Sequence, residues 1–518
     1  MSELAQLALA AFERGDLQQA ARALGEHLKA SPKDHGAWYW LALVHVRGGR
    51  ADLAVPEIAQ ALALDRRNAD YHNLQGIVLA ECGEHEQALQ CFRRALKIHP
   101  VLTDAHYNLG KVLRKQGRAE EALEALSRAR KLDAARADVL HTLGRALVDV
   151  GRLEEAHREY TAFAQAQPHD ADAQCLLATT TVYIEGVAAA EAIYRRAVVL
   201  HPQEEGLHWE FARFLLRTGR LAAGWRESVW RPTRKSRAPV PRLAELEGKR
   251  VLFEQEQGIG DVVFFARFAP ALRRHAARVM LRCERKIAPF VARLGAFDEV
   301  LTDPVAAQAQ RADCVLPLDD APAILASDVA APSLRAAPRH PAVWRQRLAA
   351  LGPPPYVALT WRAGTDNSKI PEYQRGLIDL MYKEVSLPEL GRALRELPGT
   401  LLAVQRAPRE GEIAALSAAT GREVRDFCEL NDDVGEMSEL LSAIDDYVGV
   451  SNTNMHLVAA LGRPARVLIP FPPDWRWMLE GAQSPWFPGF RLYRQARDCS
   501  WAPALAELRG DLAEARRG

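Results

Sequence analysis

Small residues recur every 34 positions along the first 230 residues of the chain. One series runs through Ala8, Ala42, Gly76, Gly110, Gly144, Ala178 and Ala212, and a second through Ala20, Ala54, Ala88, Ala122, Ala156, Ala190 and Gly224. A glycine also recurs at Gly15, Gly49, Gly83, Gly117, Gly151 and Gly219, with Glu185 as the one exception. Small residues let two helices approach closely, and glycine suits a left-handed turn between them. The period predicts seven antiparallel helical pairs that stack into an all-α solenoid.

A stacked solenoid leaves a concave groove, which usually holds an extended segment of a partner. An arm that only spaces or oligomerises the molecule is the alternative. Asn73 and Asn108 stand at different positions of the repeat, so no asparagine ladder for a peptide backbone is predicted.

From residue 249 onward, short apolar runs alternate with helical segments. Strands are predicted at 249–254, 278–283, 313–316, 356–361, 400–405, 446–450 and 465–469. Helices are predicted at 262–274, 287–294, 387–397, 411–420, 434–443 and 454–461, and a stretch rich in proline and alanine at 330–355 interrupts the series. Strands that alternate with helices form parallel sheets. The pattern therefore predicts two doubly wound α/β lobes, which bind ligands beyond the carboxyl ends of their strands.

The domain prediction has four parts: a solenoid at 1–235, a linker at 236–248, a first lobe at 249–345 and a second lobe at 346–518. The segment RPTRKSRAPVPR, residues 231–242, carries five basic residues and three prolines, which favours a linker over a helix. A nucleic-acid-binding patch is the alternative, but no aromatic residues alternate with the basic ones.

The composition of the 518 residues, 48% apolar and 26% charged, is that of an ordinary globular protein. The net charge of +1 gives no general attraction to nucleic acid or anionic lipid. No apolar stretch approaches the roughly 18 residues that a spanning helix needs. The seven cysteines form no C-x-x-C pair and are interpreted as buried thiols of a reducing compartment. The N-terminus lacks a basic signal-peptide region, so a cytoplasmic protein is expected.

The first candidate site is the sequence QGIGD, which follows the predicted strand at 249–254. Gly258 and Gly260 allow a tight turn into a helix whose N-terminus can host an anion. This is half of a dinucleotide fingerprint, because Val263 stands at the third glycine position, so a nicotinamide cofactor is not expected. Asp261 is either a general base that takes a proton from an attacking hydroxyl or a helix cap.

The second candidate site is the sequence VSNTNMH, which joins a predicted strand to a predicted helix. Ser451, Asn452, Thr453 and Asn454 belong to residue types that cap helices, and with the backbone N–H groups they can cradle a diphosphate. Capping alone explains them equally well. His456 lies one turn into the helix, where it either reaches a phosphate or ribose or is a structural histidine.

Two cations and three aromatic residues complete the candidates. Arg362 follows a predicted strand, and Lys383 precedes a capping box. Both either neutralise a leaving diphosphate or are ordinary surface charges. Trp475, Trp477 and Trp486 either stack on a base or sugar or fix a proline-rich loop. The chain has no Walker A loop, no H-E-x-x-H and no G-x-S-x-G, so P-loop NTPases, zinc proteases and serine hydrolases are not indicated.

The repeats of residues 1–230 resemble the tetratricopeptide repeat. Farther along, GIGDVVFFARFAPALRR (258–274), TWRAG (360–364), KEVSLPEL (383–390), VGVSNTNMHLVAALGRP (448–464) and PDWRWMLEGAQSPWFPGFRLYRQ (473–495) together resemble the lipopolysaccharide heptosyltransferase superfamily. The likeness is greater to its bacterial members that carry tetratricopeptide repeats. The resemblance implies an α + α/β fold, in which an all-α tetratricopeptide solenoid precedes two Rossmann-like lobes of the GT-B type.

Metal-independent, inverting sugar transfer from a nucleotide sugar, with no cofactor, is the activity that this resemblance implies. By the same resemblance, Asp261 is the catalytic base and Lys383 steadies the donor phosphate. Thr453 and His456 match the family's donor loop D-T-x-x-x-H, in which Asn452 replaces the aspartate.

The resemblance also makes Gln405, at the end of a predicted strand, a nucleotide contact. The functional hypothesis is a glycosyltransferase whose solenoid selects a protein or glycan acceptor. Asp261 deprotonates the acceptor, and the nucleoside diphosphate leaves onto the helix near Asn452, assisted by Lys383 and Arg362. The alternatives are a non-catalytic scaffold whose degenerate transferase lobe binds nucleotide, which the replacement by Asn452 suggests, and a lipopolysaccharide-assembly enzyme that uses ADP-heptose. Neither nucleic-acid binding nor an integral membrane protein is expected.

Overall fold

The computed structural model describes residues 3–235, 238–302, 312–326, 333–363 and 384–514. The chain divides into two compact units, Met1–Ala173 and Gln174–Gly518. The boundary falls in the first turn of helix α11 (Ala171–Ile184), so two of the seven helical pairs belong to the second unit. The repeat pattern and the packing of the chain therefore divide it at different places.

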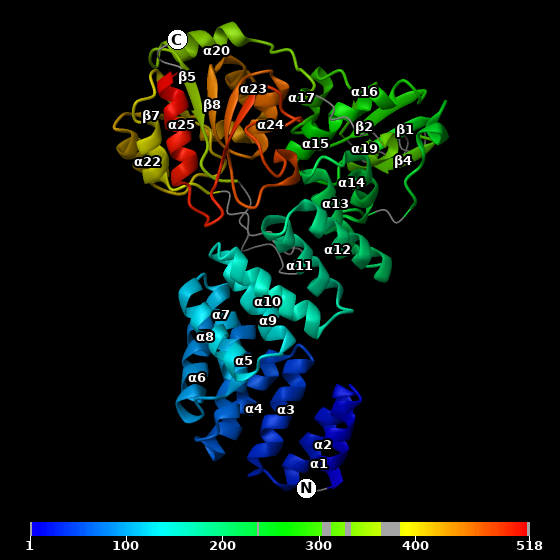
Figure 1. Ribbon diagram of the computed structural model, residues 1–518, viewed down its shortest axis with the longest axis vertical. Coiled ribbons are helices and arrows are strands. Elements are labelled where there is room, and N and C mark those ends of the chain that lie inside the picture. Colours follow the sequence, from blue (N-terminus) through cyan, green and yellow to red (C-terminus); the bar gives the residue numbers. More distant parts are fainter. Residues whose placement is uncertain (1–2, 236–237, 303–311, 327–332, 364–383, 515–518) are drawn as a thin grey trace. The chain divides into compact units, whose positions relative to one another are not determined.

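The first unit is a row of five helical pairs, coloured blue to cyan in Figure 1. Their small residues lie where the two helices of a pair touch. A Cβ atom added to Gly144 would lie 2.3 Å from Cε1 of Tyr160, 16 residues later in the next helix. The helices are α1 (Glu3–Glu13), α2 (Leu17–Ala30), α3 (His35–Arg47), α4 (Ala51–Leu64), α5 (Ala69–Glu81), α6 (His85–Ile98), α7 (Thr103–Lys115), α8 (Ala119–Leu132), α9 (Ala137–Asp149) and α10 (Leu153–Ala166).

The turn glycines of the repeats adopt the positive φ angles that the sequence pattern predicts, for example +80° at Gly15 and +81° at Gly219. The exception at Glu185 also has a structural explanation. Helix α11 continues to Ile184, and the next residue but one, Gly186, takes the left-handed position with φ +101°. The positive φ angle is therefore moved by one residue, while the hydrogen bond that closes the turn, from the backbone N–H of Gly186 to the carbonyl oxygen of Thr181, keeps the register of the other repeats.

The second unit begins with the last two helical pairs, α11, α12 (Val187–Leu200), α13 (Glu205–Arg217) and α14 (Leu221–Glu227), which ends in the 3-10 helix η1 (Ser228–Trp230). The predicted linker is not a bare connection. Arg231 is 4% exposed and ion-paired, and the 3-10 helix η2 (Leu243–Leu246) lies within 236–248.

A parallel sheet with the strand order β3-β2-β1-β4 follows. Its strand β1 reads as a run of apolar residues because the middle of a parallel strand is buried on both faces. The strands are β1 (Arg250–Glu254), β2 (Arg278–Arg282), β3 (Glu299–Leu301) and β4 (Cys314–Pro317). The helices are α15 (Ile259–Phe265), η3 (Ala266–Phe268), α16 (Ala269–Leu272), α17 (Ala288–Arg293), η4 (Leu318–Asp320) and α19 (Ala321–Leu325).

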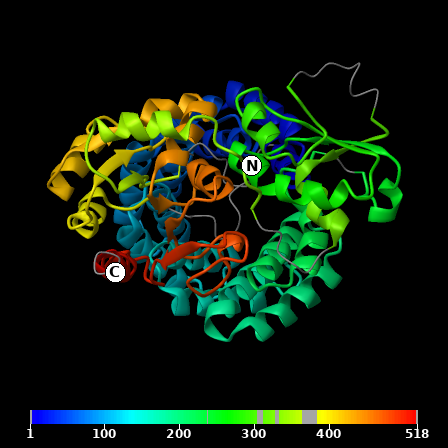
Figure 2. The ribbon, with the colours of Figure 1, turned by 90° about the horizontal axis from the view of Figure 1, so that it is seen from above.

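A second parallel sheet has the order β10-β9-β8-β5-β6-β7. Its strands are β5 (Tyr356–Leu359), β6 (Thr400–Ala403), β7 (Val424–Asp426), β8 (Asp446–Val450), β9 (Ala465–Ile469) and β10 (Phe490–Arg494). Its helices are α20 (Pro341–Ala349), α21 (Leu387–Leu394), α22 (Glu412–Thr420), η7 (Cys428–Asp432), α23 (Val434–Ala443), α24 (Thr453–Ala460), η8 (Trp475–Trp477) and α25 (Ala502–Glu514). In Figure 2 the first sheet is green and the second is yellow to red, and the two form separate regions.

One apolar core joins the parts of the second unit. It includes Leu216 and Trp225 of the last helical pair, Phe264 of α15 and Met455 of α24. A smaller core covers the other face of the second sheet, against α21 and α25. Because the first core is shared, the last helical pair and both sheets form one packed body.

All seven cysteines are free thiols, but the interpretation of all of them as buried is wrong. Cys82 is exposed, and Cys314 and Cys499 are only partly buried. Within the described ranges, no helix is both long and apolar enough to span a bilayer.

Candidate functional site

Asp261 lies in the first turn of α15, just beyond the carboxyl end of β1. Its Oδ1 accepts a hydrogen bond of 2.6 Å from Nη2 of Arg476, which comes from the loop after β9. Arg476 also donates to Oδ1 of Asp474 at 3.2 Å, and its guanidinium lies 4.3 Å from the ring centre of Trp475. An ion pair therefore links the predicted base of the first sheet region to the second.

The two glycines of the first candidate motif have different roles. Gly258 has φ −67°, which any residue adopts, so the tight turn does not require a glycine there. A Cβ on Gly260 would lie 2.9 Å from Cδ2 of His456 and 3.5 Å from Cα of Thr453. Gly260 is needed because the first turn of α15 packs directly on the first turn of α24.

Asp319 is a candidate that the sequence analysis missed. It follows β4 at the same edge of the sheet as Asp261 and is 4% exposed. Burial and, to a smaller extent, the charge of Asp261 raise the pKa of Asp319, while Arg231 and a hydrogen bond from Gln257 lower it; the net pKa is about 7. This carboxyl can therefore gain or lose a proton near neutral pH, as general acids and bases do. The sequence signal that could have identified Asp319 is its position just after the predicted strand at 313–316.

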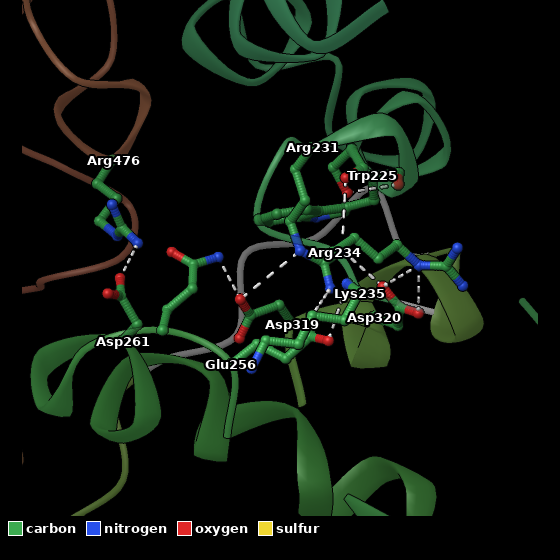
Figure 3. A network of polar contacts seen from close by, with 11 residues as sticks. Trp225, Arg231, Arg234, Lys235, Glu256, Asp261, Asp319, Asp320 and Arg476 are labelled. Atoms are coloured by element: carbon green, nitrogen blue, oxygen red, sulfur yellow. Dashed lines mark hydrogen bonds and ion pairs between the residues drawn. The ribbon is translucent and has the colours of Figure 1, made fainter. Parts of the chain in front are cut away.

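Arg231 holds the loops of the first sheet together in a buried charge cluster (Figure 3). Its Nη1 donates to Oδ1 of Asp320 at 2.6 Å, and its Nη2 donates to Oε2 of Glu256 at 3.2 Å. Arg234 donates to Asp320 as well, at 3.0 Å. Asp320 is fully buried, so these arginines compensate a charge that would otherwise be costly.

A cavity of about 160 Å³ opens next to Asp319. We call it the junction cavity, because residues of the last helical pair and of both sheet regions line it. Its lining consists of Trp209, Arg213, Leu216, Trp225, Ser228, Arg231, Gln257, Phe265, Asp319, Asp474, Trp475 and Arg476. Asp261 is connected to this lining through its ion pair with Arg476.

Asn452 caps α24, and its Oδ1 accepts a hydrogen bond from the backbone N–H of Met455 at 3.1 Å. The same Oδ1 accepts a hydrogen bond from the hydroxyl of Tyr447, and its Nδ2 donates to Oγ1 of Thr360 at 2.9 Å. An aspartate could not donate to Thr360, so the amide suits this network. Asn454 donates to the carbonyl oxygen of Val404 at 2.8 Å.

The other predicted contacts of the second sheet region form internal bonds. The Oε1 of Gln405, which is 1% exposed, accepts hydrogen bonds from the backbone N–H groups of Trp361 and Arg362 at 3.0 and 3.1 Å. The guanidinium of Arg362 binds both carboxylate oxygens of Glu412, at 2.6 and 2.8 Å. Ser451 is buried beside the cap of α24. Lys383 lies outside the described residues.

The tryptophans of the loop after β9 fix that loop in the core. Trp475, Trp477 and Trp486 are at most 4% exposed. Arg267 lies among them, with its guanidinium 4.0 Å from the ring centre of Phe264, and burial together with Arg476 lowers the pKa of Arg267 to about 9. This burial agrees with the structural interpretation for Trp477 and Trp486, whereas Trp475 also lines the junction cavity.

The structure therefore packs Gly260 against Thr453 and His456 of the other sheet region, with Asp261 in the same helical turn as Gly260 and Asp319 at the same edge of the first sheet. Within the described part of the chain, no group of three or more His, Cys, Asp or Glu side chains is arranged to hold a metal ion. The carboxylates of this region can transfer protons, and its buried donors can bind a ligand.

Three family models match the first part of the chain. Two are described as tetratricopeptide repeat, over residues 6–72 and 113–179, and one as TPR repeat, over residues 76–117. The N-terminal part consists of tetratricopeptide repeats. Stacks of such repeats form surfaces that bind protein partners.

Protein FlbA of Caulobacter vibrioides is 26% identical over 342 residues, which is 58% of this chain and 54% of FlbA. The chain thus spans about half the length of this relative. Because 58% of 518 residues is about 300, the match includes part of the sheet-containing region.

Among solved structures, pilF of Pseudomonas aeruginosa is 26% identical and covers 39% of this chain and 91% of its own, with a TM-score of 0.36. YrrB, described as a TPR protein with an unusual peptide-binding site, is 25% identical. It covers 36% of this chain and 95% of its own, with a TM-score of 0.31.

Proposed function

We propose that the chain is an inverting glycosyltransferase that moves a sugar from a nucleotide sugar to a protein or glycan acceptor bound by the repeats. The observation that carries this proposal is the placement of Asp261, Asp319 and the first turn of α24 at facing edges of two parallel sheets. A carboxylate that titrates near neutral pH beside a second carboxylate is typical of acid–base sites.

The strand orders support nucleotide binding by two Rossmann-like lobes of the GT-B type. The second sheet, renumbered in chain order from β5, has the order 3-2-1-4-5-6 read from β7, which is the doubly wound order of dinucleotide-binding folds. The first sheet has the order 3-2-1-4. Ligands of such sheets bind where the order reverses, between strands 1 and 4. In this chain those points carry Gln257 and Asp319 in one lobe and Thr360 and Asn452 in the other.

In the proposed reaction, Asp261 accepts the proton of the acceptor hydroxyl while that oxygen forms a bond to the anomeric carbon. The bond from this carbon to the diphosphate oxygen breaks, and its electron pair leaves with the nucleoside diphosphate. The N–H groups and the dipole of α24 stabilise the leaving charge, and Asn452 holds their orientation. Arg476 orients Asp261 through the 2.6 Å hydrogen bond. Lys383 remains the proposed partner of the donor phosphate.

A non-catalytic scaffold is the second candidate function. Arg362, the predicted partner of the leaving diphosphate, is bound to Glu412, and both side chains are about one-tenth exposed. Gln405 likewise binds the backbone of its own lobe. In this second function, Arg362 and Gln405 only hold the fold of the lobe together. The lobe would then bind a nucleotide without catalysing transfer, and the protein would act as an interaction module.

The experiment incubates the full chain with UDP-, GDP-, ADP- and dTDP-sugars and measures the release of nucleoside diphosphate. Release that grows with enzyme concentration supports the transferase, since these enzymes slowly hydrolyse their donor without an acceptor. Binding of a nucleotide in a thermal-shift assay, with no release over hours, supports the scaffold. The absence of both binding and release contradicts the two functions together.

A further inference from the structure

Three residues that line the junction cavity carry buried N–H donors without a hydrogen-bond partner among the described residues. The Nε1 of Trp225, the Nε of Arg231 and the Nε of Arg476 are buried and have no partner within hydrogen-bond distance among the described residues, although Nε of Arg231 lies 3.7 Å from Oδ2 of Asp319. Trp225 is 2% exposed and Arg231 is 4% exposed, so bulk water does not replace the missing acceptors. Unsatisfied buried donors are rare because they are costly, and a bound ligand can supply the acceptors that the protein lacks. The ligand indicated here offers oxygen acceptors.

The charges of the junction cavity argue against an anion. Each of the three arginines in its lining is already paired with a carboxylate, namely Arg213 with Glu210, Arg231 with Asp320 and Arg476 with Asp261. Asp319 and Asp474 add further acidic groups to the lining. The surroundings of the cavity therefore carry no excess of positive charge for a phosphate or a carboxylate ligand. A neutral ligand fits this balance.

The apolar part of the lining is aromatic. Trp209, Trp225, Phe265 and Trp475 line the cavity together with the amide of Gln257 and the carboxyl of Asp319. Aromatic faces beside a few polar groups suit a ring with apolar C–H faces and a polar edge. Hydroxyl groups both donate and accept, so they match unsatisfied N–H donors and a carboxylate at once. The volume of about 160 Å³ is below the 300 Å³ at which pockets for drug-sized ligands begin, so it fits one small unit.

We propose that the junction cavity binds one neutral monosaccharide unit. The unit lies between the last helical pair and the two sheets, with its hydroxyls on Trp225, Arg231 and Arg476 and its ring against Trp209. This inference deepens the proposed function, because it names a sugar as the ligand nearest to Asp261. Its test needs neither a nucleotide donor nor transfer, so the two proposals fail separately.

The test titrates the full chain with glucose, galactose, mannose and N-acetylglucosamine, and with inorganic phosphate, by isothermal titration calorimetry. Saturable binding of at least one sugar at millimolar concentration, and none of phosphate, is expected. Trp209→Leu removes a partly exposed ring and weakens sugar binding about tenfold or more, and Gln257→Ala, which removes one amide, also weakens it. Trp40→Leu, which removes a partly exposed tryptophan of the first unit, leaves the affinity unchanged.

Three results would overturn the assignment. The first is the absence of saturable binding of all four sugars to the native chain. The second is sugar binding that survives both Trp209→Leu and Gln257→Ala, which would place the sugar elsewhere. The third is competition between phosphate and the sugar, which would identify an anion site. Circular dichroism spectra show whether each variant keeps the native helix content. If one of the two variants fails to fold, the other still tests the site.

Discussion

Gly260 allows the two sheet regions to approach each other closely. Its hydrogen side chain lets α15 lie on α24, and an added Cβ would meet His456 at 2.9 Å. His456 is 6% exposed and packs against Phe264 and Phe487, so it has little room to move.

We expect Gly260→Ala to lower the free energy of unfolding of the second unit by about 1–3 kcal/mol, as overpacking does in cores. Gly258→Ala is the matched control, since its Cβ would have only an ordinary contact of 3.6 Å with Asp261. We expect it to change that free energy by less than about 1 kcal/mol. Urea unfolding followed by tryptophan fluorescence measures both, because nine of the eleven tryptophans lie in residues 174–518. Equal effects of the two substitutions would contradict the close packing.

The raised pKa of Asp319 makes the free energy of unfolding depend on pH. Its pKa of about 7 in the folded protein lies above the ordinary value of 3.8. The folded state therefore holds the proton more tightly, and this contribution is complete below about pH 4 and lost as the pH rises through 7. Its loss amounts to up to roughly 4 kcal/mol, from 1.36 kcal/mol per pKa unit.

Asp319→Asn removes this titration, so the variant becomes more stable relative to the native chain as the pH rises from 5 to 8. Urea unfolding at several pH values in that window checks the slope. Asp313→Asn is the control, because Arg250 lowers the pKa of exposed Asp313 to about 2, and its effect is flat in the same window. A difference between Asp319→Asn and the native chain that does not change with pH would refute the buried, titrating carboxyl.

Only some site residues could be predicted from the sequence. Local patterns predict that Asn452 caps a helix and that Asp261 follows β1. The structure has Asn452 as the N-cap of α24 and Asp261 in the first turn of α15. The pairing of Asp261 with Arg476 joins residues 215 positions apart, so no local pattern indicates it. The burial that perturbs Asp319 also depends on Arg231 and Gln257, which the fold brings together. The catalytic and nucleotide-binding roles stay predictions.

At the scale of elements, the repeats depend on contacts between a glycine and a large residue 16 positions later. Gly76 meets Phe92 and Gly144 meets Tyr160, and both rings are at most 1% exposed. These pairs explain why the small residues recur without slipping.

Gly144→Ala is expected to destabilise the first unit, even though alanine favours helix by about 1 kcal/mol over glycine. The added Cβ would lie 2.3 Å from a buried ring that cannot retreat. Gly25→Ala in α2 meets nothing within 4 Å and is expected to stabilise the same unit by up to about 1 kcal/mol. Thermal unfolding followed by circular dichroism gives the two signs. Stabilisation by both substitutions would contradict the close contact between Gly144 and Tyr160.

The predicted elements are largely confirmed where the period is strong. The strands at 446–450 and 465–469 and the helix at 434–443 have the predicted ends. The helix predicted at 262–274 is instead broken into α15, η3 and α16. Strands β3 and β7 were not predicted, because three residues are too short to show a pattern. Strand β10 was not predicted either, because it follows the aromatic loop, where the sequence shows no regular pattern.

At the scale of the whole chain, the second compact unit already begins within the repeats, before the predicted linker at 236–248. Trp225 and Leu216 of the last helical pair belong to the core that contains both sheets. Arg231 compensates the buried Asp320. The basic residues of 231–235 resemble a linker in composition, and only the tertiary fold reveals their acidic partners.

A chain of residues 171–518 should therefore fold, whereas residues 236–518 should not. The shorter chain lacks Trp225 and leaves Asp319 and Asp320 buried without Arg231, and breaking a buried pair costs about 3–5 kcal/mol. Sedimentation of the purified fragments and the cooperativity of their thermal unfolding distinguish the outcomes. A folded, equally stable 236–518 fragment would mean that the last helical pair is not part of this unit.

The central claim is that Asp261 acts as the base that activates an acceptor at the meeting point of the two lobes. Its most direct test is the rate of nucleoside diphosphate release from the preferred nucleotide sugar by the native chain, Asp261→Asn and Asp313→Asn. Both substitutions remove a carboxylate paired with an arginine, and only the first lies at the proposed site. The account predicts a loss of about 100-fold or more for Asp261→Asn and native release for Asp313→Asn. Native release by a folded Asp261→Asn variant would contradict it.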